Sequence, residues 1–363
     1  MEGKMKAGRL HAINDIRCDV VDIPQIKDDE VLIRVYCSGI CGSDLGRVFS
    51  TGCYHFPTTL GHEFGGEVVE IGKDANAQFI DERQLKIGQK VMVNPMTGCG
   101  KCKDCAEGNF NLCDNYGYTG SRSDGGFGTY CNVKAVQCYP VPDEFSWDVV
   151  AGIDPAAISL HAVVPIAGVK VNDSVVVFGT GPIGYYAVQW AVAAGAKQVI
   201  ACDIKDEKLE LIKKVGATET LNTLGMTNDE VADKLKELTG GDGPDVCIEA
   251  AGSPFTFNQA LLALKKHGVF ACIGTPHGDV NVMDKAYDKC ILRKELTIKG
   301  SWCYNFNPSF EEFKVTIEAV KKGLIKIEPL ISHRFTVDEV ADAFKLIERK
   351  EFFNKIIITQ EGY

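Results

Sequence analysis

The sequence lacks the features that mark several classes of protein. It contains no run of eighteen apolar residues, so we expect no membrane-spanning segment. The N-terminal stretch MEGKMKAGRLHAIND has neither the apolar core of a secretion signal nor the Arg- and Ser-rich pattern of a transit peptide. Internal repeats and low-complexity segments are also absent. We therefore expect a soluble, cytoplasmic protein.

Positive charge is scarce as well. The chain has 39 Lys and Arg residues against 49 Asp and Glu residues, a formal net charge of -10. A protein that follows nucleic-acid phosphates needs a basic face, so we expect no nucleic-acid partner. The 363 residues, 45% of them hydrophobic, are enough for a large core and long for one domain.

Cysteine, in contrast, is abundant, with fifteen residues. In a reducing cytosol, closely spaced cysteines bind metal more often than they form disulfides. Seven scattered cysteines lie in apolar, strand-like contexts, and we expect them to be small core residues. They are Cys18, Cys37, Cys131, Cys138, Cys202, Cys247 and Cys272.

Four other cysteines lie close together in CGKCKDCAEGNFNLC, with gaps of two, two and seven residues. Four thiolates on a glycine-broken loop suit a closed tetrahedral zinc site, whose role would be structural because no coordination position is left open. An iron–sulfur cluster and disulfides are the alternatives. The residues are Cys99, Cys102, Cys105 and Cys113.

The pattern of apolar runs predicts two domains. Short β-like runs fill the first 150 residues, which favours an antiparallel, barrel-like domain. From residue 156, apolar strands alternate with helical patterns, as in a parallel, doubly wound α/β sheet. Mixed elements return near residue 295. We predict one domain from residues 1–155 and 295–363, and a second, inserted domain from residues 156–294.

The run GTGPIG at 179–184 fits the G-x-G-x-x-G pattern of dinucleotide-binding folds. It follows the apolar strand SVVVF and opens a predicted helix, as the motif requires. Gly179 permits the tight turn, Gly181 allows close approach of a pyrophosphate, and Gly184 allows helix–strand packing. Pro182 and Ile183 complete the predicted binding loop.

Asp203 ends the next apolar run, QVIACD. A carboxylate there can bind ribose hydroxyls and repels a 2′-phosphate, which favours NAD over NADP. Lys205 and Lys208 could brace the adenosine ribose or could be solvated. Three apolar residues are candidates to pack on the cofactor, with a plain core role as the alternative: Ile183, Ile273 and Trp302.

A second metal site is dispersed along the chain. Cys41 opens CGSDLGRVF, and GHEFGGEVVEIG supplies His62 and Glu63. A thiolate, an imidazole and an oxygen ligand leave zinc one open position for catalysis. Asp154, which we expect to precede a helix, is the downstream oxygen candidate, with helix capping as its alternative role. We expect His161 to pack in the core.

These motifs together resemble the zinc-containing medium-chain dehydrogenase/reductase superfamily over essentially the whole chain. The resemblance implies a GroES-like β-barrel catalytic domain and a Rossmann coenzyme domain, with two Zn²⁺ per chain. It makes Cys41 and His62 catalytic-zinc ligands. Asp154 stands where polyol dehydrogenases usually have Glu, and Glu63 is either an alternative ligand or a base. Ser43 lies where the family has a hydroxyl that relays the alcohol proton.

Within the superfamily, CGSDLGRVF, YTGSRSDGGFGTY and ILRKELTIKGSW look most like polyol dehydrogenases that act on galactitol 1-phosphate. This implies NAD-dependent oxidation of a secondary alcohol, giving tagatose 6-phosphate. The alternatives are free polyols of the sorbitol and xylitol type, or L-threonine. A non-catalytic NAD-binding protein on the same fold is a remote alternative.

Substrate contacts are the least specific prediction. Arg47 is the first candidate for a phosphate anchor, with a salt-bridge role as its alternative, and Arg122 and Lys299 follow. Tyr54 and His55 are further candidates to line the pocket. Many relatives have a histidine at the position of Gly46, so the proton exit here needs another route, such as His55. We also expect a homodimer or homotetramer, with residues 268–284 supplying an edge strand.

Overall fold

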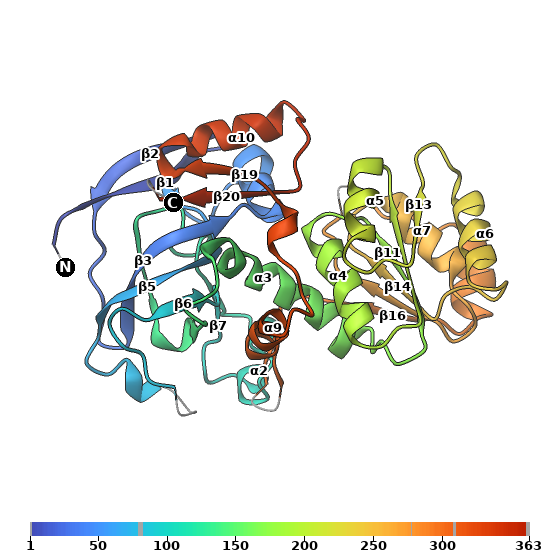
Figure 1. The fold of residues 1–363 in the computed structure, drawn as a ribbon, viewed down its shortest axis with the longest axis horizontal. Coiled ribbons are helices and arrows are strands. Elements are labelled where there is room, and N and C mark those ends of the chain that lie inside the picture. The colour runs from blue at the N-terminus through green and yellow to red at the C-terminus, as the bar shows by residue number, and fades with distance from the viewer. Residues whose placement is uncertain (1, 79–82, 277, 308–309, 361–363) are drawn as a thin grey trace. The chain divides into compact units, whose positions relative to one another are not determined.

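The structure is a computed structural model that describes residues 2–78, 83–276, 278–307 and 310–360 (Figure 1). The chain forms two compact units. The first comprises Met1–Asp154, Asn305–Lys321 and Ile327–Tyr363, and the second comprises Pro155–Tyr304 and Lys322–Lys326. Residues 295–304, which we had assigned to the first domain, belong to the second unit because they contain strand β16 (Thr297–Gly300) of its sheet.

The first unit is built on strand β3 (Glu30–Gly39). This strand pairs antiparallel with β5 (Glu63–Ile71), β9 (Tyr130–Lys134) and β20 (Lys355–Thr359). The same sheet continues through β6 (Lys90–Val93), β10 (Cys138–Pro140) and β19 (Ile331–Thr336). A three-stranded sheet contains β1 (Lys4–Ala12), β2 (Asp15–Asp22) and β4 (Thr58–Thr59).

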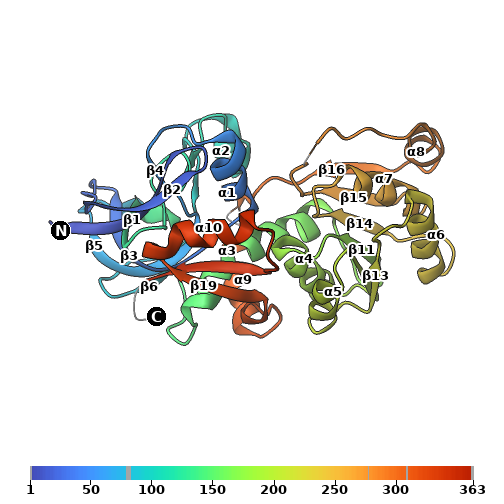
Figure 2. The same ribbon diagram turned by 90° about the horizontal axis from the view of Figure 1, so that it is seen from above.

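β-Branched residues, which favour strands, form the buried face of this sheet. Val31, Ile33 and Val35 of β3 are fully or almost fully buried, and they pack with Phe64 and Val91 of neighbouring strands in one core cluster. Helix α10 (Val340–Glu348) covers strand β19 (Figure 2). The short elements of this unit are α1 (Gly42–Gly46), β7 (Met96–Thr97), α2 (Lys103–Ala106), β8 (Gly117–Tyr118), β17 (Phe306–Asn307), β18 (Phe310–Glu311) and α9 (Glu312–Lys321).

The second unit is the predicted doubly wound fold. Its six strands are parallel, in the order β13-β12-β11-β14-β15-β16. Helices α4 and α5 cover one face of the sheet and helices α6 and α7 the other (Figure 1), so all five residues of β11 are buried. The bounds are β11 (Ser174–Phe178), α4 (Pro182–Ala193), β12 (Gln198–Asp203), α5 (Asp206–Lys213), β13 (Glu219–Asn222), α6 (Asn228–Leu238), β14 (Val246–Glu249), α7 (Pro254–Ala263), β15 (Val269–Cys272) and α8 (Asp284–Ala286).

Two features of this fold differ from the sequence prediction. The edge strands of the parallel sheet are β13 and β16. Strand β15, which lies within the predicted edge segment 268–284, is flanked by β14 and β16. Asp154 lies inside helix α3 (Trp147–His161) rather than before a helix, since Pro155 is accommodated within it. Local sequence could not locate the edge because strand order is decided by pairing between distant segments.

Helix α3 and the π-helical turn after it, Ala162–Ile166, form the one described stretch long and apolar enough to cross a membrane. Within this stretch, 72% of the most apolar window is buried inside the protein. That burial, together with Asp148 and Asp154 on the helix, is typical of a core helix rather than a membrane span.

Candidate active site and metal centres

Cys41, His62 and Glu63 come together in the first unit. Their possible ligand atoms all lie within 4.8 Å of one another. The sheet register explains this, because Gly39 of β3 pairs with Glu63 of β5. Cys41 comes two residues after Gly39 and His62 one residue before Glu63, so both lie next to this pair. A thiolate, an imidazole and a carboxylate are a donor set that zinc accepts, so these residues fit a zinc ion.

Asp44, which we did not select from the sequence, holds His62 in place. Its Oδ1 atom lies 3.3 Å from His62 Nδ1, and its Oδ2 atom accepts a hydrogen bond from the Cys41 amide at 3.0 Å. Burial opposes charge on His62, but Asp44 and Cys41 outweigh it and raise the pKa of His62 well above its usual value. A carboxylate that bonds one imidazole nitrogen directs the other toward a metal. The sequence feature that could have identified this role is the aspartate of the CGSD motif, which is Asp44.

Glu63 forms a buried ion pair with Lys355 of strand β20. Lys355 also donates to the carbonyl of Ile40 at 3.0 Å. The pair crosses Gly39, where an added Cβ atom would approach Glu63 Oε2 and the Lys355 side chain too closely, so glycine is required there. The ion pair uses Oε2 of Glu63. Lys355 has no local sequence signal, since it is 292 residues from Glu63.

Asp154 is not a member of the Cys41, His62 and Glu63 group. It is fully buried in helix α3. Its service as a zinc ligand therefore stays a prediction, and Glu63 is the acidic residue that lies with the other two ligands. His161, at the end of the same helix, is 2% exposed, in keeping with the core position expected for it.

Ser43 and Arg47 lie one helical turn apart after Cys41. Arg47 Nη1 donates to Ser43 Oγ at 2.9 Å and to Asp44 Oδ1 at 3.0 Å. Ser43 is exposed, whereas the Arg47 side chain is only 18% exposed. Arg47 thus forms an ion pair with Asp44. This is the salt-bridge role that we gave above as the alternative to a phosphate anchor. At Gly46, where many relatives have a histidine, an added Cβ atom would meet nothing closer than Thr51 Oγ1 at 3.9 Å. Steric crowding of the Cβ atom therefore does not explain why this chain has glycine there.

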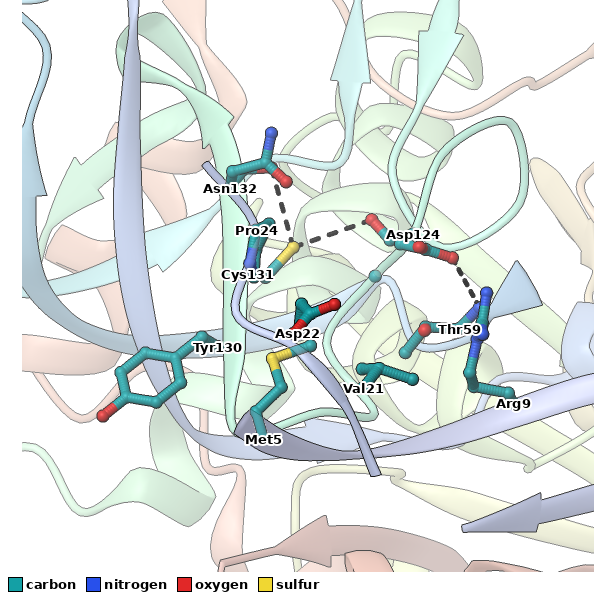
Figure 3. Close-up of a pocket in the computed structure, with 11 residues that line it drawn as sticks. Met5, Arg9, Val21, Asp22, Pro24, Thr59, Asp124, Tyr130, Cys131 and Asn132 are labelled. Atoms are coloured by element: carbon teal, nitrogen blue, oxygen red, sulfur yellow. Dashed lines mark hydrogen bonds between the residues drawn. The ribbon is translucent and has the colours of Figure 1, made fainter. Parts of the chain in front are cut away.

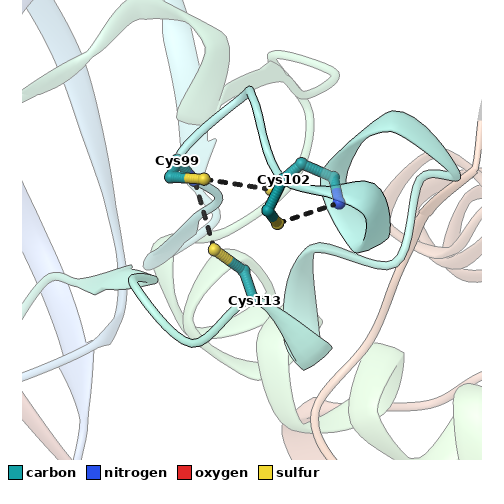
Figure 4. A group of neighbouring side chains, drawn as sticks. Cys99, Cys102 and Cys113 are labelled. Carbon is teal, nitrogen blue, oxygen red and sulfur yellow. Dashed lines mark hydrogen bonds between the residues drawn. The ribbon is translucent and has the colours of Figure 1, made fainter.

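The four clustered cysteines also converge, with their sulfur atoms within 4.8 Å of one another. Figure 4 shows the thiols of Cys99, Cys102 and Cys113 pointing toward one another. The Cys105 amide donates to Cys102 Sγ at 3.4 Å, and the Cys99 amide donates to Cys113 Sγ at the same distance. Amides of Lys101 and Cys102 lower the pKa of Cys99 to about 6. Burial, in contrast, raises the pKa of Cys105 to about 12. Four converging sulfur atoms are the donor set of a closed zinc site, so the cluster fits zinc.

The glycine-rich loop of the second unit has the shape expected for a dinucleotide cradle. Gly179 has a φ of +84°, and an added Cβ atom would lie 2.7 Å from Ala251. At Gly184, an added Cβ atom would lie 1.8 Å from the Gly179 carbonyl oxygen, so helix α4 packs too closely for a side chain. Above Gly181 the space is open, and Pro182 starts the helix. The loop thus fits a pyrophosphate at a helix N-terminus.

Asp203 ends β12 beside this loop. Its Oδ2 atom accepts from the Thr180 amide at 2.7 Å and from Thr180 Oγ1 at 2.8 Å, a contact that we did not predict. Its Oδ1 atom accepts from the amides of Ile204 and Lys205 at 2.8 and 3.1 Å. Burial lowers the pKa of Lys208, and Asp203 opposes that shift. The predicted ribose contact of Asp203 remains a prediction.

A buried carboxylate also lies at the point where the strand order reverses, between β11 and β14. Glu249 ends β14 opposite Phe178 and is 4% exposed. Its Oε1 atom accepts from the amides of Ala251 and Gly252, both at 2.9 Å, and from Thr256 Oγ1 at 2.8 Å. Since Ala251 abuts Gly179, Glu249 braces the loop that faces the glycine-rich turn. Ligands of doubly wound sheets bind at such reversal points.

The remaining candidates are placed as follows. Ile183 accepts a hydrogen bond from Ser159 Oγ at 2.9 Å, and the Ile273 amide donates to the Glu249 carbonyl at 3.0 Å. Trp302 is 51% exposed. Tyr54 is 67% exposed, and His55 is exposed and bonds Thr58 Oγ1 at 3.1 Å. Their predicted contacts with cofactor or substrate remain predictions.

A small pocket in the first unit lies elsewhere (Figure 3). Arg9, Asp22, Thr59, Asp124 and Cys131 are among its lining residues, and none of the predicted site residues line it. Asp124 Oδ1 accepts from the Thr59 amide at 2.7 Å, so this carboxylate already has a structural role. We assign no ligand to the pocket.

The fold and these sites define a zinc-dependent dehydrogenase. Residues 27–143 match the alcohol dehydrogenase GroES-like domain, and residues 182–322 match the zinc-binding dehydrogenase domain. The chain belongs to the zinc-containing medium-chain dehydrogenase family and is therefore an oxidoreductase of the alcohol and polyol type.

Individual relatives cover nearly the whole chain. Galactitol 1-phosphate 5-dehydrogenase of Escherichia coli strain K12 is 36% identical over 93% of this chain and 94% of its own. The crystal structure of galactitol-1-phosphate dehydrogenase from Escherichia coli has a TM-score of 0.87 at 34% identity, covering 99% of this chain and 100% of its own. Sorbitol dehydrogenase of Bacillus subtilis strain 168 is 30% identical over 94% of this chain and 93% of its own.

Solved structures bear on the cofactor. A short chain alcohol dehydrogenase (rspB) from Escherichia coli CFT073, complexed with NADH, has a TM-score of 0.85 at 30% identity and covers 98% of this chain and 99% of its own. A protein described as a zinc-binding dehydrogenase from Sinorhizobium meliloti 1021, bound to NADP, has a TM-score of 0.87 at 32% identity. It covers 98% of this chain and 99% of its own. Similarity therefore leaves both NAD and NADP open for this chain.

Proposed function

We propose that this protein oxidises a secondary alcohol of a sugar-alcohol phosphate with NAD, converting galactitol 1-phosphate to tagatose 6-phosphate. The observation that carries the proposal is the convergence of Cys41, His62 and Glu63, with Ser43 two residues after Cys41 in the chain. Similarity to galactitol 1-phosphate 5-dehydrogenase supports the choice of substrate. Asp203 supports NAD, because its carboxylate repels a 2′-phosphate.

Cys41, His62 and Glu63 would hold the catalytic zinc, and Cys99, Cys102, Cys105 and Cys113 a structural one. When bound, zinc supplies a Lewis acid for the alcohol oxygen, and NAD supplies the acceptor for the hydride that leaves carbon. Ser43 Oγ takes the hydroxyl proton of the alcohol and passes it outward. Arg47 donates to Ser43 Oγ and so orients that hydroxyl for the transfer.

In the second unit, Gly179, Gly181 and Gly184 shape the cradle for the pyrophosphate, and Asp203 and Lys208 bind the adenosine ribose. Ile183, Ile273 and Trp302 are the proposed apolar contacts of the cofactor. The exposed edge strand β16 supports a homo-oligomer, a dimer or tetramer, and the cytoplasm is the proposed compartment.

Steady-state formation of NADH tests this function. The zinc-loaded protein should give its highest kcat/KM with galactitol 1-phosphate, compared with galactitol, sorbitol, xylitol and L-threonine. Faster turnover of free sorbitol or of L-threonine would overturn the assigned substrate. NADH binding without turnover of any of these alcohols would favour a non-catalytic protein.

A further inference from the structure

Arg122 lies between two tyrosine rings in the first unit. Its Cζ atom is 4.3 Å from the ring centroid of Tyr54 and 4.2 Å from that of Tyr116. Nη2 of Arg122 also donates to the Tyr54 hydroxyl at 3.2 Å. Both rings lie within cation–π distance of the guanidinium, so a further ligand would bind through N–H donors that the tyrosines do not use.

The charge of Arg122 is not compensated by a carboxylate. Among the residues that the structure describes, Arg122 forms no ion pair, whereas Arg47 pairs with Asp44 and Arg334 pairs with Asp148. In the same described part of the chain, the buried Nε atom of Arg122 has no hydrogen-bond partner. The Tyr116 side chain, together with Tyr54, raises the pKa of Arg122. Arg122 thus carries a positive charge that no carboxylate in the described part of the chain balances.

A row of contacting rings links Arg122 to the candidate zinc ligands. The His62 ring is 5.4 Å from the Tyr118 ring, and the Tyr118 ring is 6.5 Å from the Tyr116 ring that Arg122 covers. Tyr118 is fixed in strand β8, and the Arg122 amide donates to its carbonyl at 2.8 Å. The guanidinium is therefore held by both backbone and rings at a defined place in the same unit as Cys41.

We propose that Arg122, clamped by Tyr54 and Tyr116, binds the phosphate monoester of the substrate. The inference rests on the proposed function and identifies the anchor that makes the substrate a phosphorylated polyol. Guanidinium edges form charge-assisted hydrogen bonds with phosphate oxygens. The two rings hold the side chain in place before the substrate arrives, which lowers the ordering cost of binding. Arg47 is less suited to this role, because its charge is balanced by Asp44 and its Nη1 atom donates to Ser43 and Asp44.

Kinetics of Arg122→Ala and Arg122→Lys with galactitol 1-phosphate and with galactitol test the anchor. We expect the Ala variant to raise KM for the phosphorylated substrate about 10- to 100-fold, the effect of losing one charge-assisted hydrogen bond. KM for galactitol should change less than about 3-fold, and the Lys variant should be intermediate. Tyr54→Phe, which keeps the ring, should retain most of the affinity, whereas Tyr54→Ala should not. Arg349→Ala, at an exposed ion pair of the same unit, is the matched control.

Equal increases in KM for both substrates, or no increase, would overturn the anchor. An Arg122→Ala effect confined to L-threonine would identify a carboxylate site and overturn the assignment to phosphate.

Thermal shift with inorganic phosphate separates this inference from the proposed function. Phosphate should raise the Tm of the wild-type protein and not that of Arg122→Ala, whether or not any polyol is oxidised. If phosphate stabilises both proteins equally, the anchor is wrong, even if galactitol 1-phosphate is the substrate. If only the wild type responds and no polyol is turned over, the anchor stands and the proposed function fails.

Discussion

The Oδ1 atom of Asp44 lies 3.3 Å from Nδ1 of His62, and both side chains are almost completely buried. Because Asp44 fixes the imidazole ring, Asp44→Asn should weaken zinc binding at the Cys41 site about 10- to 100-fold, the usual effect of losing a partner that orients a ligand. Competition with a zinc indicator dye measures this affinity.

The four-cysteine zinc is the internal control for Asp44→Asn. Its affinity should not change, since Asp44 contacts none of those cysteines. An unchanged affinity at the Cys41 site would show that Asp44 does not position His62.

Ser43→Ala removes the proposed proton acceptor. The variant should lower kcat by about 10²- to 10⁴-fold, the typical contribution of a positioned acid or base. Binding of NADH, followed by its fluorescence, should stay as in the wild type because Ser43 lies in the other unit from the glycine-rich loop. Ser50→Ala, a nearby exposed serine that bonds the Gly46 carbonyl, is the control. If kcat falls equally in both variants, Ser43 has no specific role in proton transfer.

Glu249→Gln tests the buried carboxylate at the strand-order reversal. Burial raises the pKa of Glu249, although its hydrogen bonds oppose the shift. A carboxyl group whose folded-state pKa is raised gives stability at low pH that is lost as pH rises through that pKa. The free energy of unfolding of the wild type should therefore fall relative to that of the Gln variant as pH rises above the usual pKa of a glutamate, by about 1.4 kcal/mol for each pH unit by which the pKa is raised.

Glutamine keeps an acceptor for the Ala251 and Gly252 amides, so the loop should survive this substitution. A difference in Tm that does not vary with pH would contradict a raised pKa for Glu249. Glu219→Gln, at the exposed start of β13, controls for the loss of an acidic residue from the same sheet.

Motifs that lie within one short segment could be predicted from the sequence. The glycine-rich loop and the four-cysteine lobe each lie within one short run, so residue spacing alone implies their geometry. The parallel sheet followed from strands and helices that alternate along the chain. Cys41 and His62 were selected as metal ligands from their residue types and contexts, and the resemblance to a known family supported that choice. They lie just after β3 and just before β5, which pair with each other.

Contacts between distant segments could not be predicted in this way. Lys355 reaches Glu63 only because β20 pairs with β3, and nothing near position 355 indicates an ion pair. The clamp around Arg122 likewise joins Tyr54 to a turn 68 residues away. Asp44 was close to the motif but was overlooked, because its effect on His62 depends on the register of β3 and β5. Asp154 was expected before a helix, since proline usually lies at a helix start, yet Pro155 lies within α3.

Zinc content and turnover of Cys41→Ser test the central claim most directly, which is that Cys41, His62 and Glu63 form the catalytic metal centre. The wild-type protein should contain two zinc ions per chain. The variant should contain one, held by the four clustered cysteines, with turnover abolished and with Tm and NADH binding largely kept. Retained turnover, or loss of both zinc ions together, would contradict the account.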